Sequence, residues 1–503
     1  MDKVYSFLIK NDGFDLWCKL ENIETGVALF SNKISEPMAM TTQMVGKLAN
    51  DIVTSLKVKT KQDVMKAPTN NAEAYEYYLR AKHKWEKRLK LEDKEIVRML
   101  LHKSIELDDK LLASKILLGR TYLFKIPYYN VLDETVDNEK AKEIFNNVVL
   151  ESQVIGDKLW QGRAYRHIGI IFHRQNNYEA ALEYSIKALE ISEILDDKFG
   201  IALALNNIGG FYAEEGKYDI ALSYYARSLA INQLLDEKIS IARNLRISSY
   251  AFRDKGEFDK FLEYEFRSIE VYEQLKDKQE VAYQYRSIGN GYLDRGNYDE
   301  AIDYLLRTLK LRKEVDNNKY LVGLSLFDLG LAFYYKGEYS KALELYNQSD
   351  DILTEVGATG GLDWTVTHKG IVYFQHEKFN RAIEYLEKSF VIQQKIGFDS
   401  IERNIDDRRY LLLESSVYLA LSKKKLGQKY NLGYKYDVKK IHSFIEEDKE
   451  IMDFHFFYAL YKLQEQTSYL ETAYNQVQDK ASAMEEGLGK KFLSYLIPSA
   501  IVE

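Results

Sequence analysis

The chain has 503 residues, of which 46% are hydrophobic, and its 70 basic and 77 acidic residues give a formal net charge of −7. That hydrophobic content excludes large-scale disorder, and the length suits about three domains or one long repeat array. With only 4 prolines and 27 glycines, a turn-dense β sandwich is excluded, and the mild acidity argues against a nucleic-acid-binding protein. We therefore expect a mainly helical protein.

A single cysteine, Cys18, cannot form an intrachain disulfide or a cysteine-based zinc site. The first residues contain no apolar run of signal-peptide length, and no stretch of about 18 uncharged apolar residues occurs elsewhere. We expect a cytoplasmic protein without a membrane span.

Residues 1–65 show a pattern of their own. The segments SFLIK, FDLWCKLENI and GVALFSN are separated by the turn signals NDG and TG, and a helical pattern follows over 42–56. Three strands and one helix are therefore predicted, as a small α/β segment. The run DLWCKLENIETGVALFSNKISEP, followed by a helix ending IVTSLKVK, resembles the C-terminal half of a TolB-like domain, so we interpret residues 1–65 as a partial TolB-like segment.

Two divergent helix pairs are expected over residues 72–157. The first pair reads AEAYEYYLRAKHKWEKRL and KEIVRMLLHKSIELDD, and the second reads KLLASKILLGRTYLF and NEKAKEIFNNVVLESQVIGD. Apolar residues recur in both at the spacing of an amphipathic helix.

A regular repeat occupies residues 158–397. Its small residues recur every 40 positions, with one interval of 41, at Gly169, Gly209, Ser249, Gly289, Gly330 and Gly370. An aromatic residue follows each of them nine positions later, and each unit is predicted to form a helix, a turn and a second helix. Because glycine within a helix costs about 1 kcal/mol relative to alanine, its recurrence indicates a close crossing of two helices.

These repeats resemble the tetratricopeptide repeat (TPR), as in LNNIGGFYAEEGKYDIALSYYARSLAI over residues 205–231. They lack the proline after the second helix and gain about six residues between units, which is similar to the 40-residue TPR of kinesin light chains and Rap-type bacterial regulators. The resemblance implies a mainly α fold: a right-handed TPR α-solenoid of about ten helix pairs with the small N-terminal α/β segment. Such pairs bury their apolar faces by stacking.

Divergent C-terminal helical repeats and a cap are expected over residues 398–503. The order of a TolB-like segment, divergent pairs and 40-residue units resembles the C-terminal region of bacterial adenylate/guanylate cyclase-associated TPR proteins. No cyclase domain fits in this chain, so that resemblance implies a shortened relative or a fragment.

Motifs for catalysis or metal binding are missing from the sequence. None of the eight histidines belongs to an HExxH motif or a Cys/His cluster, and GNGYLDRG lacks the Lys-Ser/Thr ending of a phosphate-binding loop. We expect no enzyme activity, no metal and no cofactor.

In a TPR solenoid, the first helix of each unit lines a concave groove. Its groove positions lie six, three and two residues before the small residue and one and four after it. In the first four regular units these positions hold six arginines, no lysine and no carboxylate, although the chain has 50 lysines and 20 arginines. The candidate partner-binding residues are Arg163, Arg166, His167, Asn206, Asn207, Arg243, Arg246, Tyr250, Arg253, Arg286 and Asn290.

Arginine pairs with carboxylates through two parallel hydrogen bonds, and asparagine can bond a peptide backbone through both its donor and its acceptor. The groove therefore suits an acidic extended peptide. Alternatively, the arginines pair with acids of adjacent repeats and hold the solenoid together. In the next two units the same positions become apolar or aromatic, as at Phe327, Tyr334, Trp364 and Phe374, which predicts either anchors for a partner or internal packing.

Together these features predict a non-catalytic protein-protein interaction scaffold or sensory module that binds a protein or peptide partner in bacterial signalling, with no nucleic acid. Two alternatives stay open: the regulatory portion of a class III nucleotide cyclase lacking its catalytic domain, and a Rap-type ligand-responsive regulator.

Overall fold

The structure is a computed structural model that describes most of the chain. The described ranges are 3–10, 13–21, 28–37, 69–86, 91–123, 137–315, 318–396, 407–429, 453–484 and 486–502. They divide into two compact units, one formed by residues 1–127 and 134–231 and the other by residues 128–133 and 232–503.

The first unit begins with a three-stranded antiparallel sheet in the order β1-β2-β3. Its strands are β1 (Lys3–Lys10), β2 (Gly13–Glu21) and β3 (Ala28–Pro37). The three strands predicted for residues 1–65 are therefore present, whereas the helix predicted over 42–56 lies outside the described residues. The TolB-like relationship stays a prediction.

The remainder of the first unit is helical. Its helices are α2 (Ala72–Glu86), α3 (Leu91–Leu107), α4 (Leu112–Leu123), α5 (Asn138–Ile155), α6 (Lys158–Arg174), α7 (Tyr178–Ile194), α8 (Lys198–Glu214) and α9 (Tyr218–Leu234), whose last turn crosses the boundary between the units. Each helix packs against the next one along the chain from α2 to α8.

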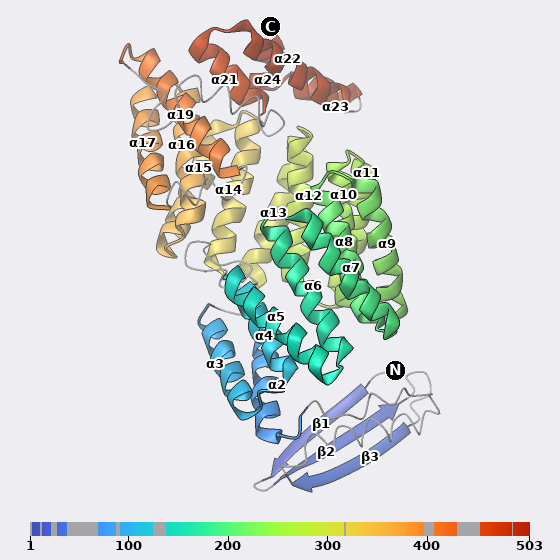
Figure 1. The fold of residues 1–503 in the computed structure, drawn as a ribbon. Coiled ribbons are helices and arrows are strands. Elements are labelled where there is room, and N and C mark those ends of the chain that lie inside the picture. The colour runs from blue at the N-terminus through green and yellow to red at the C-terminus, as the bar shows by residue number, and fades with distance from the viewer. Residues whose placement is uncertain are drawn as a thin grey trace. The chain divides into compact units, whose positions relative to one another are not determined.

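The second unit also consists of successive helices. They are α10 (Lys238–Asp254), α11 (Phe258–Gln274), α12 (Lys278–Asp294), α13 (Tyr298–Val315), α14 (Lys319–Tyr335), α15 (Tyr339–Glu355), α16 (Thr359–Gln375), α17 (Phe379–Ile396), α19 (Asp407–Lys425), α21 (Phe454–Gln464), α22 (Thr467–Ser482), α23 (Glu486–Leu493) and α24 (Leu496–Val502). In Figure 1, α14, α15, α16 and α17 lie side by side as stacked antiparallel pairs.

The small residues lie where the two helices of a pair cross, as predicted. A Cβ added to Gly330 of α14 would lie 2.6 Å from the ring of Tyr346 in α15, and one added to Gly209 would lie 2.6 Å from the ring of Tyr225. A side chain at these positions would therefore push the paired helices apart. This spacing of the backbones is why the sequence repeats small residues at this position.

Turns between the helices depend on two other repeated features. Gly216 and Gly256 follow the first helix of their pairs with φ of 73° and 86°, the left-handed region that favours glycine. Aspartate begins the next pair at Asp157 and Asp197, whose side chains accept hydrogen bonds from backbone N–H groups of the first turn of the helix. The residues added between units therefore supply helix caps.

The last helices of the second unit fold back onto its earlier part. The buried ring of Phe492 in α23 packs against the turn at Gly296, and Tyr335 donates a hydrogen bond of 3.3 Å to Asp453, just before α21. Arg295 donates a hydrogen bond of 2.8 Å to the carbonyl of Ala483. These contacts join α21, α22 and α23 to the region of α12, α13 and α14.

Candidate functional site

Eleven candidate residues lie on the first helices of their pairs, α6, α8, α10 and α12. We call the side of a first helix that carries the predicted groove positions its helix-A face. The two units are described separately below, and each candidate is placed by its contacts.

In the first unit, Arg163 and Arg166 both belong to α6 and are half-buried. The guanidinium carbon of Arg163 lies 4.5 Å from the ring centroid of Trp160. Arg166 places Nη2 2.9 Å from Nε2 of His167. Neither arginine has a carboxylate partner among the residues that the structure describes.

His167 was predicted to line the groove, but it is buried, with only 1% of its surface exposed. Its ring stacks on Phe145 of α5 with 4.9 Å between ring centroids. Burial lowers the pKa of His167 well below its ordinary value, and the neighbouring Arg166 lowers it further. The neutral ring of His167 therefore accepts a hydrogen bond from the Arg166 guanidinium.

Sequence analysis missed a third arginine, Arg120 of α4. The preceding residue, Gly119, occupies the crossing position of its pair, since an added Cβ would lie 2.6 Å from the ring of Phe145. Arg120 therefore takes the groove position directly after the small residue. The 40-residue period does not reach it because additional residues separate α4 from α5, although the glycine in LLGRTYL is a visible signal.

The charges of these arginines act on one another. Burial lowers the pKa of Arg166 to about 9, and the positive charges of Arg120 and Arg163 contribute to the same shift. The guanidinium carbon of Arg120 lies 5.8 Å from the ring centroid of Trp85. Three guanidinium groups are thus gathered on α4 and α6, and two of them lie over tryptophan rings.

Asn206 and Asn207 are half-buried on α8, the next first helix of the unit. The Nδ2 atom of Asn207 has no hydrogen-bond partner within the described ranges. The amide groups predicted to meet a peptide backbone are therefore on a helix that packs beside α6.

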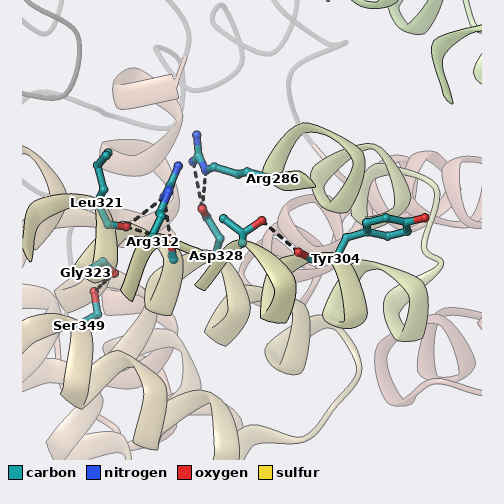
Figure 2. A network of polar contacts seen from close by, with 9 residues as sticks. Arg286, Tyr304, Arg312, Leu321, Gly323, Asp328 and Ser349 are labelled. Atoms are coloured by element: carbon teal, nitrogen blue, oxygen red, sulfur yellow. Dashed lines mark hydrogen bonds and ion pairs between the residues drawn. The ribbon is translucent and has the colours of Figure 1, made fainter. Parts of the chain in front are cut away.

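In the second unit, Arg286 of α12 is an internal structural residue. Its Nε and Nη2 donate to the two carboxylate oxygens of Asp328 at 2.5 and 3.1 Å (Figure 2). Asp328 belongs to α14 and is 6% exposed. The charge of Asp328 raises the pKa of Arg286. The alternative of pairing between repeats therefore describes this arginine.

The other candidate arginines of the second unit differ in whether they contact a carboxylate. Arg246 contacts Glu280 of α12 at 3.5 Å, and Arg253 donates a hydrogen bond of 3.0 Å to its neighbour Asp254. Arg243 is exposed and has no carboxylate partner in the part of the chain that the structure describes. Tyr250 and Asn290 are half-buried on α10 and α12, with the Tyr250 ring beside Arg253.

Glu265 of α11 is a buried carboxylate that sequence analysis also missed. It is fully buried at the crossing position of its pair, where Oε1 accepts hydrogen bonds from Ser249 at 2.8 Å and Ser287 at 2.9 Å. Burial raises the pKa of Glu265 to about 7, against the opposing effect of Arg246 and Arg253. An acid at a position that holds Ser, Tyr or Leu in the other regular units was the available signal.

Two of the aromatic residues at the groove positions of the later units belong to the core. Phe327 and Tyr334 are buried, and Phe327 packs against Trp364 with 6.2 Å between ring centroids. For Phe327 and Tyr334, internal packing rather than an exposed anchor is the correct interpretation.

The residues that the structure describes hold neither a cluster of metal ligands nor a membrane-spanning helix. Those residues contain no group of three His, Cys, Asp or Glu that could hold a metal ion. None of the described helices has the length and apolar character needed to cross a membrane.

Comparison with known proteins identifies the repeats. Two family models, both described as tetratricopeptide repeat, match the chain, one over residues 280–355 and the other over 162–195 and 201–235. Together with the stacked helix pairs, these matches show that the chain contains TPR repeats and that its helical part is a TPR α-solenoid. No curated protein matches the sequence.

Several solved structures are similar to this chain at low sequence identity. A signal transduction ATPase with numerous domains and a TPR sensor, from Pyrococcus horikoshii, is 16% identical with a TM-score of 0.53, over 80% of this chain and 56% of that one. RapI without ligand is 17% identical with a TM-score of 0.49, over 76% and 98%. A Rap protein complexed with Competence and Sporulation Factor is 16% identical with a TM-score of 0.45, over 75% and 99%. This chain spans about half of the Pyrococcus protein, and the likeness shows the fold alone.

Proposed function

We propose that this chain is a non-catalytic interaction or sensory module that binds an acidic peptide or an acidic segment of a protein on its helix-A faces, within bacterial signalling. TPR solenoids present the faces of their first helices along a stack, which suits an extended ligand. The residues that would meet the ligand are the candidates that the structure leaves half-buried or exposed.

One observation carries this proposal. Arg163, Arg166 and Arg243 have no carboxylate partner among the described residues, although acids outnumber bases in the chain by 77 to 70. A chain with an excess of acids can pair its arginines internally, as Arg286 does with Asp328. Arginines left without an acid in such a chain point to an acid supplied by a partner.

Paired arginines have a different role in this proposal. Arg286 and Arg246 connect α12 with its neighbouring first helices and fix the spacing of the stack. The proposed binding residues are therefore fewer than the predicted ones: Arg163 and Arg166 on the first unit and, separately, Arg243 on the second. No particular observation favours the cyclase-regulatory alternative, which stays a prediction.

Fluorescence anisotropy tests the proposal. The probe is a short fluorescein-labelled peptide of alternating glutamate and alanine with an amidated C terminus, here called the glutamate peptide, and its control replaces every glutamate with glutamine. We expect the full chain to bind only the glutamate peptide, and added salt to weaken this binding. Equal affinity for both peptides, or binding of neither, would overturn the acidic character of the partner.

A further inference from the structure

The core of the second unit contains a carboxyl group whose hydrogen bonds are not satisfied. Glu414 of α19 is 5% exposed, and its Oε2 has no hydrogen-bond partner among the residues that the structure describes. Buried carboxyl oxygens in folded proteins normally accept hydrogen bonds or contact a cation. A donor for Glu414 is therefore to be sought outside the described chain.

Two buried tyrosines of α15 lie near Glu414 and share this property. Tyr346 is fully buried and Tyr339 is 8% exposed, and neither hydroxyl has a hydrogen-bond partner within the described ranges. Burial, and then the charge of Glu414, raise the pKa of Tyr346. Burial also raises the pKa of Tyr334, to which both Tyr339 and Glu414 contribute. We call Glu414, Tyr339 and Tyr346 the Glu414 cluster.

The surroundings of Glu414 are acidic or neutral. Burial and the negative charge of Asp453 both raise the pKa of Glu414 well above its ordinary value. Burial lowers the pKa of His368 to about 4, so its ring adds no positive charge near neutral pH. Asp453 itself contacts His455 at 3.2 Å. A cation brought close to Glu414 would therefore meet acceptors and no competing positive charge from His368.

Aromatic rings surround the same place. The ring centroid of Tyr346 lies 5.6 Å from that of Phe327 and 6.1 Å from that of His368, and Tyr334 lies 6.4 Å from His368. The faces of such rings attract organic cations. A hard metal ion needs about six oxygen ligands, and the described residues hold no group of three His, Cys, Asp or Glu that could bind one. The chemistry therefore favours a protonated amine.

We propose that Glu414, Tyr339 and Tyr346 bind the ammonium group of a small protonated amine between α15 and α19. An ammonium group donates three hydrogen bonds, and a carboxylate and two tyrosine hydroxyls supply three oxygen acceptors. This inference goes beyond the proposed function and does not depend on it, because it uses none of the arginines. Bound amine would join α15, which pairs with α14, to α19, which packs against α16.

Saturation-transfer NMR on the methyl resonance of methylammonium detects this binding directly in the full chain. Glu414→Gln keeps the shape of the protonated acid but removes the charge that the ammonium group would meet. Its matched control is Glu384→Gln, at an exposed glutamate of α17. We expect methylammonium to bind the wild type and Glu384→Gln alike, and Glu414→Gln at least about tenfold more weakly.

Thermal unfolding gives an independent measurement. At about 0.1 M, methylammonium chloride should raise the Tm of the wild type and of Glu384→Gln above their values in potassium chloride of equal ionic strength, but not that of Glu414→Gln. Tetramethylammonium carries the charge without an N–H donor and should have no such effect. Tyr346→Phe removes a single acceptor and should weaken methylammonium binding.

Several results would overturn the site. Equal binding of methylammonium to Glu414→Gln and Glu384→Gln, or unchanged binding to Tyr346→Phe, would place the amine elsewhere. Equal stabilisation by tetramethylammonium would exclude hydrogen bonds to the cluster, and no difference from potassium chloride would exclude the amine. A Tm of Glu414→Gln several degrees below that of the wild type in potassium chloride would show that the carboxyl group is structural.

Discussion

Arg286 of α12 and Asp328 of α14 are joined by two parallel hydrogen bonds between successive first helices of the second unit. Arg166 of α6 occupies a corresponding groove position, three residues before the small residue, but contacts the neutral ring of His167 instead of a carboxylate. The same residue type at the same repeat position therefore has two different sets of contacts. What separates them is whether the next first helix supplies an acid.

Removing the paired arginine should destabilise the second unit. Arg286→Met leaves the carboxylate of Asp328 buried without its cation, and we expect a loss of about 2 kcal/mol in the free energy of unfolding, reduced from the fully buried case because Arg286 is partly exposed. Arg307→Met removes an exposed pair with Asp303 and should change stability by less than about 0.5 kcal/mol. Urea denaturation of both variants measures the difference, and equal stability would contradict the structural role of Arg286.

The crossing of paired helices makes a second prediction. Gly330→Ala places a Cβ against the ring of Tyr346 and should cost about 1–3 kcal/mol, although alanine is the better helix former. Gly487→Ala in α23 meets no atom within 4 Å and should leave stability unchanged or raise it. Thermal unfolding compares the two variants. A stabilising Gly330→Ala would mean that α14 and α15 do not cross closely at this residue.

Glu265 predicts a dependence of stability on pH. Burial raises its pKa to about 7 in the folded chain, whereas an unfolded chain titrates this residue near its ordinary value of about 4.3. Between these values the folded state binds the proton more tightly than the unfolded state. The stabilising contribution of the protonated carboxyl is therefore complete below about pH 4 and is lost as the pH rises through about 7.

The comparison of wild type with Glu265→Gln isolates this effect. Glutamine resembles the protonated acid, so the two chains should have similar stability near pH 4. Above about pH 8 the glutamine variant should be more stable, by up to about 3 kcal/mol. Parallel stability curves across this range would show that Ser249, Ser287, Arg246 and Arg253 hold Glu265 ionised in the folded chain.

Much of the fold could be predicted because the residues that helix crossings and turns require recur at regular intervals in the sequence. Gly169 and Gly330 lie at helix crossings, and Gly216 has the positive φ of a turn between helices. Each position at which glycine recurs therefore corresponds to one steric requirement of the fold. The C-terminal helices are different. The contact between Phe492 and the turn at Gly296 joins residues far apart in the sequence, and no local pattern marks such a pair.

The candidate site was less predictable, because its properties depend on neighbours outside the repeat. From their positions in the repeat, Arg286 and Arg166 were both predicted to bind the partner. Only the contact of Arg286 with the carboxylate of Asp328 distinguishes the two arginines. The same rule placed His167 on the surface, although Phe145 covers it. Arg120 was missed because the divergent pair α4 and α5 is longer between its helices than the regular units.

The most direct test of this account is the affinity of the glutamate peptide for two matched variants, Arg163→Met and Arg286→Met, measured by anisotropy below the Tm of either protein. The account predicts at least a tenfold weaker affinity for Arg163→Met with an unchanged Tm, and a near-normal affinity for Arg286→Met with a lowered Tm. The reverse result, with binding lost in Arg286→Met and retained in Arg163→Met, would contradict the claim that the arginines without internal acids bind the partner.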